Sequence, residues 1–161
     1  MELPVIQRLK KELDELKYEL KSKLPKELEA ARAHGDLSEN AEYEAAKERQ
    51  GYVTARIGQI EQRIRELSLY SVHSIPQDVV SYGSQVTLES NDDGETTVYL
   101  IVFPEEVDAA AGQISLGSPL GRALLNKGVG DEIEVQTPKG KRSYQIVELV
   151  TWHDREKVSG N

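Results

Sequence analysis

The sequence contains no cysteine, which excludes disulfides, thiolate metal sites and cysteine nucleophiles. Its three histidines are scattered, so a histidine-rich metal site is not expected either. Long apolar runs are also missing: the longest, residues 98–103, is far short of the roughly 18 residues of a membrane span. Charged residues interrupt the first 16 positions, so no signal-peptide core is present. We therefore expect a cytoplasmic protein without a membrane segment.

Positive charge is in short supply, and its distribution divides the chain into two parts. The 161 residues carry a formal net charge of −8. Residues 1–70 are dense in charge of both signs and have a net charge of −1, whereas residues 71–161 have a net charge of −7. Neither part is basic enough to hold a phosphate backbone unaided, so an autonomous nucleic-acid binder is disfavoured. The length fits one domain or two small ones.

The N-terminal part has the apolar periodicity of two helices. One seam runs from Ile6 to Ala31 and a second from Ala46 to Leu67, both with spacings of three and four residues. Pro25 interrupts the first seam and predicts a kink. The segment between the seams, residues 34–40, supplies a C-terminal glycine and several N-cap candidates. Residues 1–72 are thus predicted to form an antiparallel two-helix coiled-coil hairpin with arms of roughly 45 Å.

The C-terminal part has the pattern of a small α+β module. Residues 73–83 hold Pro76, Gly83 and several serines, as expected of a linker. Within residues 84–161, the sequence predicts a short helix over 119–126, because Ser118 is a suitable N-cap and Pro119 occupies the favoured first position. Strands are predicted at residues 84–88, 96–103, 131–137 and 143–150.

Two separated stretches resemble one protein family. The run G-D-L-S-E-N-A-E-Y at residues 35–43 is similar to the tip signature of the bacterial transcript cleavage factors GreA and GreB. Residues 118–125, S-P-L-G-R-A-L-L, resemble a stretch of the family's globular domain. The resemblance implies an FKBP-like antiparallel-sheet domain behind the hairpin. The segment from Asn40 to Gln50 looks nearer to GreA than to GreB, which predicts removal of short RNA pieces.

The resemblance also implies a function shared with a partner. The hairpin would enter the secondary channel of bacterial RNA polymerase, where Asp36 and Glu39 would assist hydrolysis of the backtracked 3′ segment of the nascent RNA. Magnesium is usually held by one or two carboxylates plus water and substrate phosphates, so two acids on an exposed tip cannot complete a tight site. We therefore expect a second Mg²⁺ to be shared with the polymerase, and a monomeric accessory factor rather than an independent enzyme.

Other positions carry expected roles together with plainer interpretations. The resemblance places Arg32 and Lys47 at the RNA, although both also fit ordinary solvated helix charges. Asp36 and Glu39 equally fit a capping box. Leu37, Ser38, Asn40 and Tyr43 are expected to support the tip, and capping or packing explains them almost as well. The resemblance assigns contact with a coiled coil at the channel rim to four residues of the C-terminal module, which also suit an ordinary helix start: Ser118, Pro119, Leu120 and Arg122.

Two other functions compete with a cleavage factor. A Gre-like regulator could occupy the polymerase channel without promoting cleavage, although retention of Asp36 and Glu39 in an intact signature argues against it. A coiled-coil adaptor with no polymerase connection would leave the two separated resemblances unexplained. The tail beyond Thr151 runs past the usual end of the family, and the sequence assigns it no function; it is a candidate for disorder.

Overall fold

The computed structural model describes residues 2–33, 37–70 and 72–159. The chain divides into two compact units, Met1–Val72 and His73–Asn161. None of the helices in these described ranges is long and apolar enough to cross a membrane.

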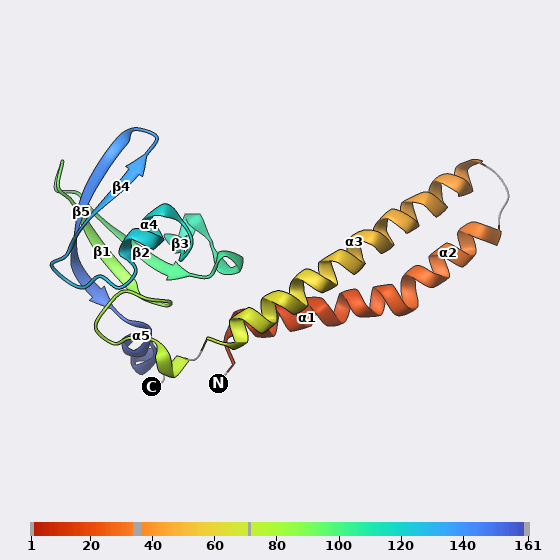
Figure 1. The fold of residues 1–161 in the computed structure, drawn as a ribbon, viewed down its shortest axis with the longest axis horizontal. Helices are drawn as coiled ribbons and strands as arrows, with labels where there is room; N and C mark the ends of the chain where they lie inside the picture. The colour runs from red at the N-terminus through yellow and green to blue at the C-terminus, as the bar shows by residue number, and fades with distance from the viewer. Residues whose placement is uncertain (1, 34–36, 71, 160–161) are drawn as a thin grey trace. The chain divides into compact units, whose positions relative to one another are not determined.

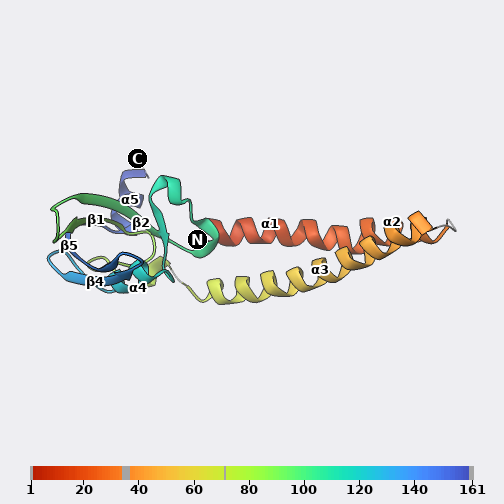
Figure 2. The same ribbon diagram turned by 90° about the horizontal axis from the view of Figure 1, so that it is seen from above.

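The first unit is a helical hairpin (Figures 1 and 2). One arm consists of α1 (Pro4–Tyr18), the π-helix η1 (Glu19–Lys23) and α2 (Leu24–Ala33), and the other is the single helix α3 (Leu37–Ser68). The two predicted seams meet between the arms, because α1 and α2 both pack against α3. Buried seam residues include Leu9, Leu16, Leu24 and Ala31 from the first arm and Ala46, Val53, Ile57, Ile60 and Leu67 from the second.

The first arm passes Pro25 without a break in the helix. Pro25 is the second residue of α2, directly after the π-helix Glu19–Lys23. A proline clashes with the carbonyl four residues before it, and that residue, Lys21, lies in the wider π turn. The π-helix also explains why the apolar spacing changes to three successive intervals of four residues. Figure 1 shows the arm changing direction between α1 and α2, which agrees with the expected kink and locates its cause in the π-helix as well as the proline.

The second unit is built on a five-stranded sheet in the order β3-β2-β1-β5-β4. Neighbouring strands are antiparallel except for β2 and β3, which are parallel. The expected antiparallel-sheet domain with a short helix is confirmed, and the short strand β3, which was not predicted, adds one parallel pairing that makes the sheet mixed. The strands are β1 (Gln85–Ser90), β2 (Thr96–Val102), β3 (Gln113–Ser115), β4 (Glu132–Thr137) and β5 (Gly140–Val150).

One face of this sheet carries the core. Its buried side chains alternate along the strands, as in Val86 and Leu88 of β1, and Leu124 of the helix α4 (Pro119–Leu124) joins the same cluster. α4 ends two residues earlier than predicted because Leu125 leaves the helical conformation, with ψ of 133°, and Asn126 is left-handed, with φ of 67°. Asparagine is among the few residues other than glycine that adopt this conformation readily. The remaining helices are η2 (Val72–Ser74), η3 (Pro104–Glu106), η4 (Ala109–Ala111) and α5 (Trp152–Ser159).

Residues 73–83, expected to be a linker, instead fold into the second unit. The backbone N–H of Val80 donates to the Lys127 carbonyl at 2.8 Å, and the Asn126 N–H donates to the Val80 carbonyl at 3.0 Å. The Val80 side chain is fully buried. The C-terminal tail is not an unstructured extension either, since it forms α5. Local composition suggested a linker, but long-range pairing with residues 126–127 fixes this segment.

Candidate functional site

The candidate site lies around the turn of the hairpin. α2 ends at Ala33 and α3 begins at Leu37, so His34, Gly35 and Asp36 lie outside the described residues. Leu37, Ser38 and Glu39 form the start of α3, although their side chains are not among those described. The metal-binding and capping roles of Asp36 and Glu39 therefore stay predictions. Asn40, in the same turn of α3, is exposed.

Tyr43 joins the two arms just behind this turn. The Arg32 guanidinium of α2 donates a hydrogen bond to the Tyr43 hydroxyl of α3, with 3.1 Å between Nη2 and the oxygen. The Arg32 Cζ atom lies 5.4 Å from the centre of the Tyr43 ring, and the Lys47 Nζ atom lies 5.8 Å from it. Both distances fall within the range of cation–π attraction. The structure thus brings together three side chains that the sequence could only assign one by one.

The pKa values of two residues in this cluster, Arg32 and Tyr43, are shifted by the hydrogen bond between them. The hydrogen bond from Arg32 is the main cause that lowers the pKa of Tyr43 from its ordinary value, because it favours the phenolate form. The same hydrogen bond raises the pKa of the Arg32 guanidinium. The two cations lie near one aromatic ring while their side chains stay exposed. They line a groove of about 470 Å³ together with Pro25, Leu28, Glu29 and Tyr43.

A second groove near the hairpin turn has a different chemistry. It has a volume of about 430 Å³ and contains four alanines and two glutamates, Glu27 and Glu42, next to Arg49. On α2, the residues of the two grooves are offset by about half a helical turn, so the grooves lie on different sides of the arm. The basic and aromatic groove is therefore confined to one side of the hairpin.

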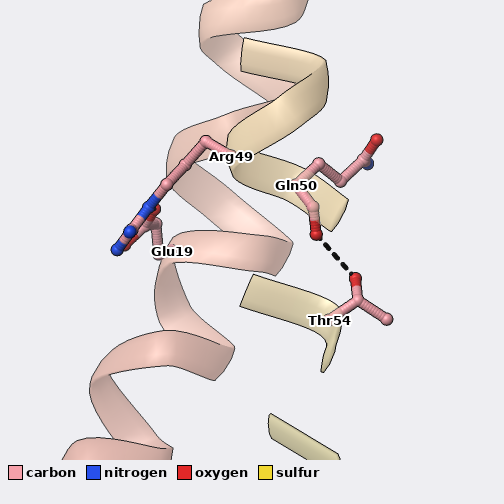
Figure 3. Close-up of polar contacts among 4 residues, drawn as sticks. All are labelled: Glu19, Arg49, Gln50 and Thr54. Carbon is pink, nitrogen blue, oxygen red and sulfur yellow. Dashed lines mark hydrogen bonds and ion pairs between the residues drawn. The ribbon is translucent and has the colours of Figure 1, made fainter. Parts of the chain in front are cut away.

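Cross-arm ion pairs hold the arms in register. Arg49 of α3 makes a two-pronged contact with Glu19 of the π-helix, with 2.6 Å from Nε to Oε2 and 2.9 Å from Nη2 to Oε1 (Figure 3). Arg56 contacts Glu12 in the same manner, at 3.0 and 3.3 Å. The planar guanidinium matches a carboxylate in this geometry, so each pair resists axial sliding of the arms. Sequence reasoning missed both pairs, because it compared apolar spacing within each arm and not charges across them.

Gln50 is the polar exception in the second seam. It is only partly exposed, and Figure 3 shows its backbone carbonyl accepting a hydrogen bond from the Thr54 hydroxyl at 2.8 Å. The bond connects residues one turn apart on α3, which satisfies the hydroxyl within the helix.

Glu19 gives the hairpin a specific dependence on pH. The hydrogen bond from Arg49 is the main cause that lowers the pKa of Glu19 below its ordinary value of 4.5. A carboxyl with a lowered folded-state pKa stabilises the fold above its unfolded-state pKa, and this contribution is lost as the pH falls through the folded-state value. We expect Glu19→Gln to lower the melting temperature of the hairpin by about 2–4 °C at pH 7. We expect this difference to shrink below pH 4.5 in thermal unfolding followed by circular dichroism.

Glu15 provides the control for this experiment. It is an exposed carboxylate on the same arm. Glu15→Gln removes an equal charge without the two-pronged contact, so it is expected to leave the melting temperature within about 1 °C of the parent over the same pH range. Equal losses in the two variants would contradict a specific role for the Glu19–Arg49 pair.

The predicted docking residues lie at the start of α4. Ser118 is its N-cap: the Gly121 N–H donates to Ser118 Oγ at 3.0 Å, and this hydroxyl donates to the Ser115 carbonyl at 2.7 Å. Pro119 and Arg122 are exposed, whereas Leu120 is partly buried against the core. The cap confirms the local structure expected of this sequence. Contact with a partner stays a prediction, for which Pro119 and Arg122 offer the accessible side chains.

In the described part of the chain, no group of three or more histidine, aspartate or glutamate side chains is placed to hold a metal ion. Carboxylate oxygens are nevertheless the ligands that magnesium prefers, and Asp36 and Glu39 bracket the start of α3 in the sequence. The donor set therefore fits Mg²⁺ chemically and needs further ligands from elsewhere.

The fold and the candidate site define a two-unit protein in which a helical hairpin, with an aromatic and basic cluster beside its turn, is followed by a small mixed-sheet domain. The family model for the N-terminal domain of transcription elongation factors matches residues 5–68, and the model for the C-terminal domain of GreA/GreB factors matches residues 75–150. The chain belongs to the GreA/GreB family, and its role is that of a transcription elongation factor.

Curated relatives match over most of their length. The transcription elongation factor GreA of Brucella anthropi is 45% identical over 139 residues, which cover 84% of this chain and 88% of the relative. GreA of Syntrophobacter fumaroxidans is 43% identical over 143 residues, covering 89% and 92%. GreA of Rickettsia canadensis is 39% identical over 142 residues, covering 88% of each.

Solved structures of similar proteins include GreA factor homolog 1 of Thermus thermophilus. It is 31% identical, with 89% of this chain and 93% of that chain covered and a TM-score of 0.41. A GreA/GreB factor from Nitrosomonas europaea is also 31% identical, with 58% and 78% covered and a TM-score of 0.43.

Proposed function

We propose that this elongation factor inserts its hairpin into the secondary channel of bacterial RNA polymerase and stimulates hydrolysis of backtracked nascent RNA. The observation that carries this proposal is the position of the G-D-L-S-E-N-A-E-Y run, residues 35–43, across the junction between the two arms. Asp36 immediately precedes the first residue of α3, and Glu39 is in the first turn of that helix. A hairpin can carry both acids into a narrow channel while its arms stay paired through their apolar seam.

The chemistry of the reaction is divided between the two proteins. When bound, Mg²⁺ activates water and stabilises the charge that develops on the oxygens of a phosphodiester during in-line hydrolysis. Asp36 and Glu39 contribute carboxylate oxygens toward one such ion, and the polymerase and RNA contribute the remaining ligands. A donor set of two carboxylates cannot by itself fill the six positions that magnesium requires. The protein therefore acts as a catalytic accessory, and the polymerase supplies the endonucleolytic site.

The cluster of Arg32, Tyr43 and Lys47 suits the RNA 3′ segment. Two cations beside one aromatic ring attract phosphate groups and offer a flat surface to a base. The Arg32–Tyr43 hydrogen bond joins α2 to α3, so the Arg32 guanidinium keeps a defined place relative to the turn. One or two charges steer a phosphate backbone without binding it tightly, which suits an RNA that the polymerase already holds.

The second unit serves as the docking domain. Pro119 and Arg122 are exposed at the start of α4, whose direction is fixed by the Ser118 cap, and Leu120 supports the helix from the core. We assign the contact with a coiled coil at the rim of the polymerase channel to this region. The protein acts as a monomer in this role and works in the cytoplasm, where the polymerase is.

A reconstituted cleavage assay tests the proposal. Backtracked polymerase complexes with 5′-labelled RNA and Mg²⁺ are incubated with and without the protein, and a third reaction contains the protein, RNA and Mg²⁺ without polymerase. We expect rapid shortening of the RNA only when both proteins are present. Hydrolysis by the protein alone would contradict the accessory role. Binding to the polymerase without cleavage would overturn the cleavage function and identify a regulator that occupies the channel.

A further inference from the structure

The two arms of the hairpin carry nearly the same six-residue sequence close to the turn. Residues 27–32 of α2 read E-L-E-A-A-R, and residues 42–47 of α3 read E-Y-E-A-A-K. The two copies also share one pattern of burial: the second position is partly exposed, the fifth, Ala31 or Ala46, is 8% exposed, and the other four are exposed. Because the arms run antiparallel, the copies are related by an approximate two-fold axis that passes between them.

This repeat explains why the hairpin has two grooves of different chemistry. The first, fourth and fifth positions of both copies line the groove that contains alanines and glutamates. The second and sixth positions of both copies line the other groove, and these residues are Leu28, Arg32, Tyr43 and Lys47. Side chains lean toward the N-terminus of their own helix, so Arg32 and Lys47 lean toward each other in antiparallel arms. The approximate symmetry therefore brings two cations into one groove.

The second position of the repeat breaks the symmetry, because it is Leu28 in one copy and Tyr43 in the other. The Arg32 guanidinium donates a hydrogen bond across the arms to the Tyr43 hydroxyl, at 3.1 Å. The symmetry-related contact would join Lys47 to Leu28, and a leucine side chain has no hydrogen-bond acceptor. Lys47 is a point charge on a flexible stem, 5.8 Å from the centre of the Tyr43 ring. The two cations are therefore held differently, and a directional bond fixes the guanidinium.

We propose that Tyr43 is a positioning residue, whose hydroxyl presents the Arg32 guanidinium to a phosphate of the backtracked RNA, while Lys47 adds charge without direction. The bond to Tyr43 uses a donor on Nη2 and leaves the other N–H groups of the planar fork for phosphate oxygens. The Arg32 side chain is exposed, so these donors are accessible. This role of Tyr43 rests on the proposed function, because it requires the hairpin turn to reach the RNA.

Binding to two kinds of polymerase complex tests this role without relying on cleavage. The full-length protein is titrated, without Mg²⁺ so that the RNA stays intact, into fluorescent complexes with backtracked RNA and into complexes that have not backtracked. Tyr43→Phe keeps the ring and removes only the hydroxyl. We expect it to weaken binding to the backtracked complex about 3–10-fold, the range of one hydrogen bond, and to leave binding to the other complex unchanged. No loss, or an equal loss for both complexes, would overturn the proposal.

A double-mutant cycle separates positioning of Arg32 from a direct contact between Tyr43 and RNA. If the hydroxyl acts through Arg32, Tyr43→Phe causes no further loss of affinity in an Arg32→Ala background. In a Lys47→Ala background, Tyr43→Phe is expected to cause its full loss, because the hydrogen bond to Arg32 is still there to be broken. Losses that add fully in the Arg32→Ala background would overturn the positioning role and indicate that Tyr43 contacts the RNA itself.

Tyr52→Phe is the matched control. Tyr52 lies further along α3, is 57% exposed and has its ring centre 5.1 Å from Arg49 Cζ. Removal of its hydroxyl is expected to leave both affinities unchanged, and a loss equal to that of Tyr43→Phe would contradict a specific role for Tyr43. The melting temperature of each variant shows that the hairpin is folded.

Cleavage assays with Mg²⁺ on the same proteins separate this role from the proposed function. If the parent does not stimulate cleavage, the proposed function fails, and the difference in affinity between the parent and Tyr43→Phe still decides the role of Tyr43. If the parent stimulates cleavage and Tyr43→Phe binds backtracked complexes as tightly as the parent, only the role of Tyr43 fails.

Discussion

Asp36→Asn is expected to lower stimulated RNA cleavage by at least about 100-fold while leaving the melting temperature unchanged. Removing a group that only orients a metal ligand already lowers metal affinity or activity about 10–100-fold. Removing a ligand itself is therefore expected to lower activity by at least the upper end of that range. Asparagine caps a helix as well as aspartate does, whereas alanine at an N-cap costs about 1 kcal/mol. The substitution therefore separates a metal role from a capping role. The measurement is the initial rate of RNA shortening in backtracked polymerase complexes, alongside thermal unfolding.

Neighbouring substitutions sharpen the interpretation of that result. Glu39→Gln is expected to reduce cleavage comparably, since both acids serve one ion in the proposed reaction. Glu48→Gln removes one carboxylate from an exposed position further along α3, so it controls for a general change of charge and is expected to retain most of the activity. Higher Mg²⁺ concentration is expected to restore part of the Asp36→Asn rate, because the defect is in metal binding. Normal cleavage by Asp36→Asn would return Asp36 to a structural role.

The apolar pattern was sufficient to predict the hairpin, because burial of a seam between two helices depends on local periodicity. After Leu16 the apolar residues are four apart three times in succession, and this spacing coincides with the π-helix. From the sequence, Pro25 suggested only a kink. A π-helix and a proline bend produce similar sequence patterns, since both accommodate a disturbed hydrogen-bond ladder. Only the path of the backbone distinguishes them.

Pairing between distant residues was beyond the reach of sequence patterns. Glu19 and Arg49 are 30 positions apart, and Arg32 and Tyr43 are 11 apart, so neither pair follows from spacing within one helix. The candidate residues at the hairpin turn were recognisable by family resemblance, whereas the contact between Arg32 and Tyr43 depends on the axial register of the arms. That register is set by packing and by the cross-arm ion pairs together.

Residues 73–83 show how composition misleads at a domain boundary. Serine, proline and glycine indicated a linker, but the segment contains the buried Ile75 and Val80 and is bound by elements near residues 126 and 153. The sequence signal of a linker is the low local density of apolar residues. This signal contains no information about distant elements that fold back onto the segment, such as the tail that forms α5.

Gly121→Ala is expected to destabilise the sheet unit by about 3 kcal/mol, lowering its melting temperature by on the order of 10–20 °C. Helix propensity alone predicts the opposite sign, because alanine normally stabilises a helix interior by up to about 1 kcal/mol relative to glycine. The steric clash outweighs helix propensity at this position, because a Cβ atom on Gly121 would overlap the Ser115 carbonyl oxygen and lie 3.0 Å from Ser118 Oγ. The oxygen belongs to the backbone of β3, which pairs with β2, so it cannot move aside without disturbing the sheet edge.

Gly117→Ala is the matched control for this prediction. A Cβ atom on Gly117 would lie 3.6 Å from Ser115 Oγ, an ordinary contact, so the change is expected to alter stability by no more than about 0.5 kcal/mol. Arg122→Ala, at an exposed position of the same helix, is expected to leave the melting temperature unchanged and to weaken binding to the polymerase. All three variants are measured by differential scanning calorimetry and by polymerase binding. The melting temperature reports how α4 packs, and the affinity for polymerase reports whether α4 contributes to docking. Equal melting temperatures for Gly121→Ala and Gly117→Ala would show that α4 can move away from β3, which would contradict the steric argument for Gly121.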